Sequence, residues 1–295
     1  METIPAKTIL SGYADTAWFG ANYNMNLYKG CCHGCIYCDS RSLCYHTPVP
    51  FEDVEAKENA PQLLEAALRS KRKRCMIGTG AMCDPYLHAE KELQLTRRCL
   101  EVICRNGFGA TVLTKSDMVL RDIDLLEQIN RDSKAVVQMT LTTLDDDLCR
   151  IIEPNVCPTS RRFEVLCELR ERGIPTVVWL TPLLPFINDT EENVRGILEL
   201  AHRAGCKGVM AFGMGLTLRD GSREYFYEAL DRHLPGVKER YIKRYVNNYE
   251  LPSPDTARLL AMFHEECARY GMMSDPDRIF AYLNEFPECE QLTLF

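Results

Sequence analysis

Short apolar runs that are rich in β-branched residues alternate with longer amphipathic segments from about residue 74 onward. The apolar runs predict five strands, at residues 74–78, 110–115, 135–141, 176–181 and 208–214. The amphipathic segments between them predict helices near residues 87–106, 119–131, 159–172 and 189–203. A further strand before residue 31 and a helix near residues 53–70 complete about six strand–helix units. Alternation of this kind predicts an α/β fold, with a parallel sheet covered by helices.

The ends of the predicted strands are the expected place for a ligand. Periodicity alone does not separate an open doubly wound sheet from a partial barrel. In both folds, however, ligands bind at the carboxyl ends of the strands. The residues just beyond these ends are therefore candidates for the site: Thr79, Asp84, Lys115, Thr140, Thr142, Pro182 and Met214.

After Met214 the pattern no longer predicts strands. It becomes helical and aromatic, as in the segments EYFYEALDRHL, ERYIKRYVNNY and TARLLAMFHEECARYG. The sequence therefore predicts a main domain over residues 1–215 and a C-terminal helical extension over residues 216–295 that packs on it.

Composition and charge place the chain in an ordinary soluble class. Of its 295 residues 46% are apolar and 26% are charged. The net charge of −7 argues against a surface that attracts nucleic acid as a whole, although a local basic groove is compatible with that average. The N-terminus lacks the apolar run of a secretory signal, and no stretch is apolar enough to span a bilayer. We therefore expect a cytoplasmic protein that does not bind membranes.

Fifteen cysteines are a high number for a chain of this class. Most stand singly within apolar patterns, and free cysteine behaves there as a small apolar residue. These we interpret as reduced core or half-buried thiols: Cys99, Cys104, Cys149, Cys167, Cys206 and Cys267. The run from Cys31 to Cys38 is dense enough to indicate chemistry.

The dense run has the spacing CxxxCxxC at Cys31, Cys35 and Cys38. Three thiolates on one short loop can each bind one iron of a 4Fe–4S cube, and the fourth iron is then free to take a cofactor. Gly30 and Gly34 let the loop bend closely around such a cube. The alternative is a zinc site, which normally needs four ligands and is often built from two CxxC pairs. No second pair is present, so the fourth ligand would be Cys32, His33 or Cys44.

This loop resembles the signature of the radical S-adenosylmethionine (SAM) superfamily. Five stretches, the first of which contains most of this loop, occur in the order of its spore photoproduct lyase-like branch, whose members are often labelled DNA-repair photolyases: NLYKGCCHGC, GTGAMCDPYLHAEKELQLTRRCLE, LTKSDMVLRDIDLL, LTTLDDDLCRIIEP and GIPTVVWLTPLLPFINDTEE. The resemblance covers roughly residues 20–215. It implies a partial (βα)6 barrel that is open on one side. It also implies a 4Fe–4S cluster, SAM, and an external electron donor such as flavodoxin or ferredoxin.

The resemblance also assigns roles to residues at the strand ends. Thr79 and nearby backbone carbonyls would hold the amino group of SAM, and Lys115 and Thr140 would bind its methionine end. The alternative for each is an ordinary strand-end side chain. A lysine suits this role because it donates charge-assisted hydrogen bonds to a carboxylate. Tyr37 would pack near the adenine, or else be a plain packing aromatic.

The sequence departs from the true lyase near the second strand. That enzyme returns a hydrogen atom to its substrate radical from a cysteine there. The nearest thiol in this chain is Cys83, which falls about two positions late, with Ala81 in the expected place. Thymine-dimer repair therefore does not follow from the sequence. The resemblance implies reductive cleavage of SAM and hydrogen abstraction from a substrate, and it favours a nucleic-acid lesion or base as that substrate. A small molecule or peptide is the alternative, favoured by the acidic net charge. A non-catalytic iron–sulfur protein is the alternative from another class.

Several other polar residues carry simpler expectations. Asp84 would face an entering substrate or cap the following helix, Asp189 would cap a helix, and Glu153 would be a local hydrogen-bonding anchor. A basic stretch near residue 240 predicts either an amphipathic surface helix or a nucleic-acid groove with tyrosines for stacking. Its residues are Lys238, Arg240, Tyr241, Lys243, Arg244 and Tyr245.

Overall fold

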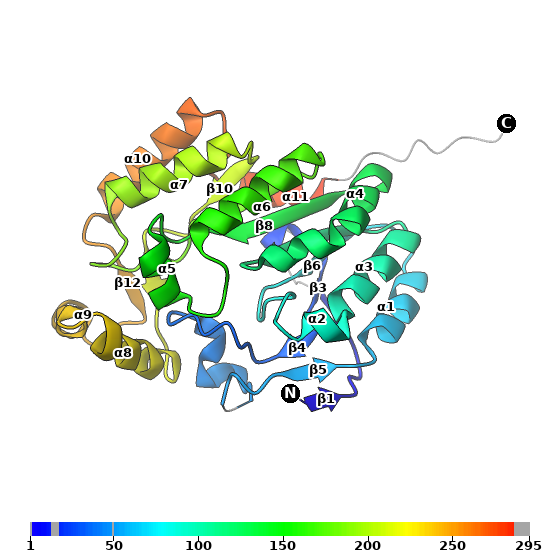
Figure 1. The fold of residues 1–295 in the computed structure, drawn as a ribbon, viewed down its shortest axis with the longest axis horizontal. Helices are drawn as coiled ribbons and strands as arrows, with labels where there is room; N and C mark the ends of the chain where they lie inside the picture. Colours follow the sequence, from blue (N-terminus) through cyan, green and yellow to red (C-terminus); the bar gives the residue numbers. More distant parts are fainter. Residues whose placement is uncertain (1, 13–17, 49, 286–295) are drawn as a thin grey trace.

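The computed structural model describes residues 2–12, 18–48 and 50–285. Its centre is a seven-stranded sheet with the strand order β10-β9-β8-β7-β6-β3-β2 (Figure 1). The strands are β2 (Leu10–Gly12), β3 (Tyr23–Met25), β6 (Met76–Thr79), β7 (Gly109–Thr114), β8 (Ala135–Thr140), β9 (Thr176–Trp179) and β10 (Gly208–Met210). The six strands from β3 to β10 are parallel and stand in chain order, and β2 pairs with β3 in the antiparallel direction. The predicted α/β fold with a central parallel sheet is confirmed.

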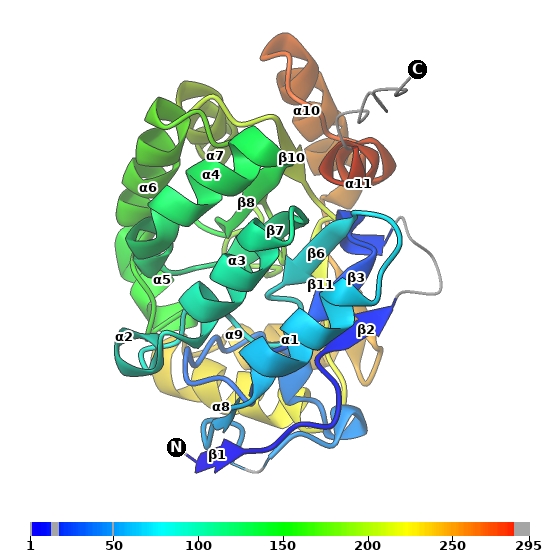
Figure 2. The same cartoon turned by 90° about the vertical axis from the view of Figure 1, so that its right-hand side faces the viewer.

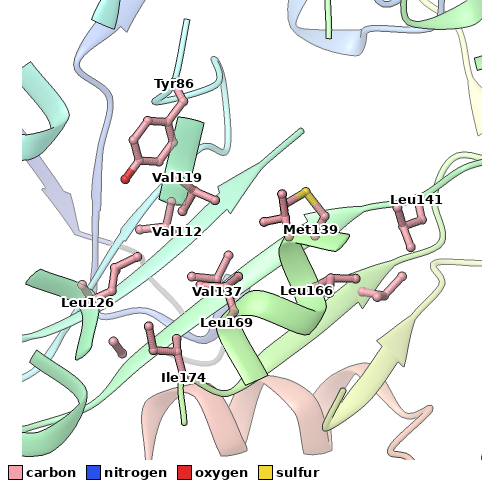
Figure 3. Close-up of a cluster of buried hydrophobic side chains, with 14 of the residues drawn as sticks. Tyr86, Val112, Val119, Leu126, Val137, Met139, Leu141, Leu166, Leu169 and Ile174 are labelled. Atoms are coloured by element: carbon pink, nitrogen blue, oxygen red, sulfur yellow. The ribbon is translucent and has the colours of Figure 1, made fainter. Parts of the chain in front are cut away.

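Helices that connect the parallel strands cover one face of the sheet (Figure 2). They are α1 (Ala60–Arg69), α3 (Leu95–Arg105), α4 (Ile123–Asp132), α6 (Thr159–Glu171) and α7 (Glu191–Arg203). The short helices α2 (Glu90–Leu93) and α5 (Asp146–Ile152) stand in the same connections. Figure 3 shows part of the core beneath them, where side chains of β7 and β8 meet side chains of α4 and α6: Val112, Val137, Met139, Leu126, Leu166 and Leu169. Burial of these apolar side chains fixes the order of the helices on the sheet.

The opposite face of the sheet, called the inner face below, is covered by elements from both ends of the described chain. Strand side chains alternate between the two faces, so Val136, Val177 and Trp179 point away from the helices named above. They pack against α11 (Pro276–Asn284) and the short turn η1 (Trp18–Gly20). The end of the described chain therefore packs on the inner face at β9 and β10.

The region after Met214 differs from its prediction, because it contains strands. Strands β11 (Gly215–Thr217) and β12 (Glu250–Pro252) form an antiparallel pair. Strands of three residues are too short to produce a recognisable alternation in the sequence. The rest is helical as predicted, with α8 (Ser222–His233), α9 (Val237–Tyr245), α10 (Thr256–Arg269) and α11. Helix α10 packs on α7, and α8 and α9 lie together at another end of the molecule (Figure 1).

A second small sheet was not predicted. It flanks the run from Gly30 to Cys38, which we call the cysteine loop. The sheet has the order β1-β5-β4, with β1 (Glu2–Ile4), β5 (Glu55–Lys57) and β4 (Tyr28–Lys29). Three further short turns are η2 (Asp39–Arg41), η3 (Leu43–Tyr45) and η4 (Asp117–Asp122). Across the described ranges, the helices are too short or too polar for any of them to cross a membrane.

Candidate active site

The cysteine loop begins directly after β4 and bends at two glycines. Gly30 and Gly34 have φ angles of +75° and +71°, a conformation that disfavours side chains with a Cβ. A Cβ on Gly30 would also lie 2.5 Å from the carbonyl oxygen of Phe51. The next amide, that of Cys31, donates a hydrogen bond of 2.9 Å to the same oxygen. Glycine is therefore required where the loop turns toward its first cysteine.

The three cysteines of the predicted motif come together in this loop. Cys31 and Cys35 are buried and Cys38 is half-buried. Burial raises the pKa of the Cys31 thiol well above its usual value, and the neighbouring Cys38 and Cys35 raise it further. Burial also raises the pKa of Cys35 to about 12, while the nearby Lys115 ammonium lowers it. A metal must replace the thiol protons here, and three converging sulfurs beside a positive charge fit a 4Fe–4S cluster.

The remaining thiols agree with the interpretation of the sequence. All cysteines of the described ranges are free, and the six that were predicted to be core or half-buried thiols are buried or half-buried. Cys44, an alternative zinc ligand, is exposed and lies 3.4 Å from a guanidinium nitrogen of Arg219. Among the residues that the structure describes, no three His, Cys, Asp or Glu side chains surround a point that would hold one metal ion. A cube spreads its thiolates over separate irons, so it does not need such a point.

The segment that follows α5 holds the cysteine loop by its backbone. The amide of Ile36 donates to the carbonyl of Ile152 at 3.0 Å. The side-chain amide of Asn155 donates to the carbonyl of Cys32 at 2.9 Å, and its backbone amide donates to the carbonyl of His33 at 3.1 Å. The loop is thereby fixed from the side of β8, although 110 or more residues separate the two segments in the sequence.

A buried ion pair ties the same segment to the motif tyrosine. Tyr37, between the second and third cysteines, donates its hydroxyl hydrogen bond to Glu153. Glu153 also pairs with Arg162 at 2.6 Å, and neither side chain is exposed. Arg162 in turn donates to the carbonyl of Thr140 at 2.9 Å. Burial alone would raise the pKa of Glu153, but the charges of Arg162 and Lys115 bring it below its usual value. Glu153 is the predicted anchor; Arg162, its partner, was not identified from the sequence.

Removing one member of this ion pair is expected to destabilise the fold. In Glu153→Gln the guanidinium of Arg162 stays buried without its countercharge, so the free energy of unfolding should fall by about 3–5 kcal/mol. Urea unfolding at neutral pH, followed anaerobically by circular dichroism, measures it. The exposed Glu127–Arg172 pair gives a control, since Glu127→Gln should cost less than about 1 kcal/mol. A Glu153→Gln protein as stable as the wild type would show that Arg162 needs no countercharge.

Lys115 and Thr140 lie on the inner face at the ends of neighbouring strands. Thr140 ends β8 and is in register with Trp179, which packs on the inner face. Lys115 directly follows β7, and its ammonium lies 5.9 Å from the centre of the Tyr37 ring. Burial lowers its pKa, but Cys35, Glu153 and Asp84 together raise it above its usual value. The lysine therefore keeps its positive charge beside the cysteine loop.

Thr79 ends the adjacent strand, but its side chain points the other way. It is in register with Val112, which belongs to the core between sheet and helices. Because paired residues of parallel strands point to the same face, the Thr79 hydroxyl lies on the helix side. The hydroxyl therefore does not lie on the face that carries Lys115 and Thr140, and the role of the nearby backbone carbonyls in SAM binding stays a prediction.

Asp84 connects two strand ends and does not cap a helix. One carboxylate oxygen accepts hydrogen bonds from the amide of Tyr86 at 2.8 Å and the hydroxyl of Thr114 at 2.7 Å. The other accepts from the amide of Lys115 at 2.7 Å. The residue that precedes helix α2 is Ala89. Asp84 therefore fixes the backbone at Lys115, and the expectation of a helix cap is wrong.

Cys83 is buried at the loop after β6. Its thiol donates to the carbonyl of Tyr28 at 3.2 Å, and 6% of the residue is exposed. Burial raises the pKa of the thiol to about 12, so it stays protonated at neutral pH. The thiol thus keeps the hydrogen atom that its predicted role requires, while it points to the backbone of β4.

The helix cap expected at Asp189 is also corrected by the structure. The cap of α7 is Thr190, whose hydroxyl accepts from the amide of Asn193; Asp189 instead accepts from Ser253 at 2.6 Å. Of the two predictions for the basic stretch near residue 240, the structure shows the amphipathic helix, α9. Tyr241 and Tyr245 are 0% and 3% exposed and form its buried side, so they are not available for base stacking. A separate feature is a pocket of about 430 Å³, which none of the cysteines of the loop lines. It lies between the segment after β8 and the start of α7, and Leu144, Asn188 and Asn193 are among its lining residues.

Comparison with known proteins identifies relatives for most of the chain. The family model described as the radical SAM superfamily matches residues 25–201. An uncharacterized protein of Mycobacterium tuberculosis is 27% identical over 275 residues, which cover 91% of this chain and 80% of that protein. One of Methanocaldococcus jannaschii is 33% identical over 174 residues, which cover 58% of this chain and 64% of that protein.

Solved structures share the fold at low sequence identity. Spore photoproduct lyase complexed with dinucleoside spore photoproduct has a TM-score of 0.66 at 12% identity, covering 92% of this chain and 80% of that one. The radical SAM methyltransferase TsrM from Kitasatospora setae, with cobalamin and a 4Fe–4S cluster bound, has a TM-score of 0.50 at 15% identity. Here 92% of this chain and 54% of that chain are covered.

Proposed function

Because the chain belongs to the radical SAM superfamily, we propose that Cys31, Cys35 and Cys38 hold a 4Fe–4S cluster whose fourth iron binds SAM. The cluster and SAM are the cofactors of this superfamily, and the protein is a radical SAM enzyme. When bound, they supply a 5′-deoxyadenosyl radical by reductive cleavage of SAM to methionine. The residues of this chain provide the site and its charges.

The convergence of three thiols with Lys115 is the observation that carries this proposal. Lys115 is positively charged, lies beside Cys35 and is fixed at its backbone by Asp84. We propose that its ammonium donates to the carboxylate of SAM, because a charge-assisted hydrogen bond there offsets the burial of both charges. Thr140 on the neighbouring strand adds a hydroxyl, and the carbonyls after Thr79 accept from the amino group.

The six parallel strands are proposed to form the partial (βα)6 barrel that the sequence resemblance implies. In support, the strands stand in chain order and their connecting helices lie on one face. Residues 1–215 would be this barrel and residues 216–295 its extension. Within the extension, α8 and α9 pack on the cysteine loop and α11 packs on the inner face. The extension would thereby shield the cluster and the radical from water and oxygen.

The substrate is proposed to lose a hydrogen atom to the 5′-deoxyadenosyl radical. A nucleic-acid lesion or base is the first candidate class, by the resemblance of several motifs to the spore photoproduct lyase-like branch. Tyr241 and Tyr245 of α9 are buried, so they cannot stack on nucleic-acid bases. A small molecule or peptide is therefore the second candidate class. An external electron donor such as flavodoxin or ferredoxin, in the cytoplasm, would reduce the cluster.

The proposed chemistry is tested by product analysis of the reconstituted protein. After anaerobic reconstitution with iron and sulfide, the protein should convert SAM to 5′-deoxyadenosine and methionine when dithionite is present. Without a reductant neither product should form. A reconstituted, iron-loaded protein that leaves SAM intact under dithionite would instead favour a non-catalytic iron–sulfur protein.

Cys83 is proposed as the thiol that returns a hydrogen atom to the substrate radical. Its buried, protonated state preserves that hydrogen atom. Cys83→Ala should bind and cleave SAM as the wild type does, yet release a substrate product that is not correctly quenched. In deuterated water, deuterium should enter the wild-type product through the exchangeable thiol. Wild-type product without solvent deuterium, together with an unaffected Cys83→Ala enzyme, would leave Cys83 as a packing residue.

A further inference from the structure

An exposed patch of large side chains lies beside the cysteine loop. We call it the aromatic–arginine patch, and it consists of Leu43, Cys44, Tyr45, Arg219 and Tyr249. The three large apolar or aromatic side chains are 59%, 38% and 43% exposed, respectively. Contiguous apolar side chains at a surface are a common mark of a protein interaction site.

Arg219 holds this patch together. Its guanidinium donates to the hydroxyl of Tyr45 at 3.0 Å and to that of Tyr249 at 2.8 Å. It also lies 3.8 Å from a carboxylate oxygen of Asp39. The same group lies over both rings, 5.5 and 4.8 Å from their centres. Tyrosine and arginine in such an arrangement are typical of the residues that dominate the energy of protein interfaces. The patch therefore has the composition of a binding surface.

The patch is continuous with the packing around the cysteines. Its first part, η3, begins five residues after Cys38, and the amide of Leu43 donates to the carbonyl of Asp220 at 3.0 Å. Its second part follows Leu218, which is buried in the same core cluster as Cys35 and Tyr37. The amide of Leu218 donates to the carbonyl of Tyr249 at 3.0 Å. The patch thus adjoins the core cluster that contains Cys35.

Three basic residues lie in the stretch that leads to Tyr249, in a chain that is acidic overall. The chain carries a net charge of −7, whereas residues 240–249 contain Arg240, Lys243 and Arg244 and no Asp or Glu. Exposed Glu239 and Glu250 flank this stretch, so three positive charges stand against two negative ones. In the same stretch Ile242 and Val246 are 48% and 65% exposed. An acidic partner protein would be repelled by the net negative charge of this chain and attracted by the basic residues of this stretch.

We propose that the aromatic–arginine patch and residues 240–249 form the docking surface for the reductant, a small acidic flavodoxin. The carrier loses one electron and the cluster gains one, and no covalent bond changes. The proposal rests on the proposed function, because the protein needs an electron donor only if it holds a cluster that must be reduced. Its place is argued from three observations, namely the exposed aromatic side chains, the basic residues 240–244 and the continuity with the core cluster around Cys35.

The test compares two reductants on the full-length reconstituted protein. Stopped-flow absorbance follows the bleaching of the cluster under anaerobic conditions, with reduced flavodoxin in one series and dithionite in the other. Arg219→Glu and Lys243→Glu should each slow reduction by flavodoxin about tenfold or more at low salt, because charge at an interface acts mainly on the association rate. Reduction by dithionite, a small ion that needs no docking surface, should change less than about twofold, and high salt should narrow the difference for flavodoxin.

Arg131→Glu is the matched control. Arg131 lies on α4, at the opposite side of the molecule from α9 in Figure 1, and its side chain is 69% exposed. This single charge reversal should leave both reductions unchanged. Equal slowing by Arg131→Glu and Arg219→Glu would overturn the proposal, because net charge alone would then explain the effect.

Other outcomes separate this proposal from the proposed function. If flavodoxin reduces both patch variants as fast as the wild type, the docking surface is elsewhere, whereas SAM cleavage under dithionite still supports the enzyme. If those variants keep normal reduction but lose salt-sensitive binding of a short DNA duplex in fluorescence anisotropy, the surface serves nucleic acid and the proposal is wrong. A protein that forms no cluster contradicts the proposed function itself.

Discussion

Single replacement of Cys31, Cys35 or Cys38 by alanine will abolish both the brown absorbance of the reconstituted protein and its cleavage of SAM. Each of the three thiolates would bind a different iron, so the loss of one leaves two open irons and an unstable cube. Burial has already raised the pKa values of the Cys31 and Cys35 thiols. Both positions are buried, so water has little access to replace a missing ligand in this loop. Iron content, visible absorbance and 5′-deoxyadenosine are the three measurements.

The neighbouring cysteines provide the matched controls. Cys32 stands inside the same loop and Cys44 follows it, and neither belongs to the CxxxCxxC spacing. Cys32→Ala and Cys44→Ala should keep the iron, the absorbance and SAM cleavage. The assignment of ligands is wrong if Cys35→Ala retains a cluster that cleaves SAM, or if Cys32→Ala loses it.

Lys115→Ala is expected to weaken SAM binding about tenfold or more while the cluster stays intact. The ammonium lies beside the cysteine loop and keeps its charge, because Cys35, Glu153 and Asp84 offset the effect of burial. A hydrogen bond to a charged group contributes roughly 1.5–3 kcal/mol, and about 1.4 kcal/mol corresponds to a tenfold change in affinity. Isothermal titration calorimetry with SAM on the reconstituted protein, under nitrogen, measures the difference.

A lysine at the amino ends of the strands, far from the cysteine loop, is the control for the loss of a positive charge. Lys134 precedes β8 at its amino end and donates to the carbonyl of Tyr282. Lys134→Ala should leave SAM affinity unchanged, and Lys115→Arg should retain more affinity than Lys115→Ala because it keeps the charge. Unchanged SAM binding by Lys115→Ala would make Lys115 a strand-end lysine without a role in the site.

The long strands and the cysteine loop could be predicted because their signals are local. Residues 135–141 and 110–115 are continuous β-rich runs, and they became β8 and β7 at nearly the predicted bounds. The cysteine spacing and its two glycines also lie within nine residues of sequence. By contrast, β11 and β12 have three residues each and pair across more than thirty residues. Such pairing depends on tertiary contacts, which no window of sequence contains.

Side-chain direction was harder to predict than strand position. Thr79 stands at the predicted strand end, but register with Val112 turns its side chain toward the helices. One residue of register decides the face, and the sequence alone did not fix it. Arg162 was missed for a related reason, because an arginine in an amphipathic helix is usually solvated. Its burial follows from Glu153, nine residues earlier, and from the carbonyl of Thr140.

Binding of SAM to an open iron of a three-cysteine cluster is the central claim, and electron paramagnetic resonance tests it most directly. The anaerobically reconstituted protein is reduced with dithionite, and its spectrum is recorded before and after SAM is added. We predict a signal of a reduced 4Fe–4S cluster that changes shape and position with SAM in the wild type, and changes far less in Lys115→Ala at the same SAM concentration. A wild-type signal that saturating SAM leaves unaltered, or a protein that holds zinc and gives no signal, would contradict the claim.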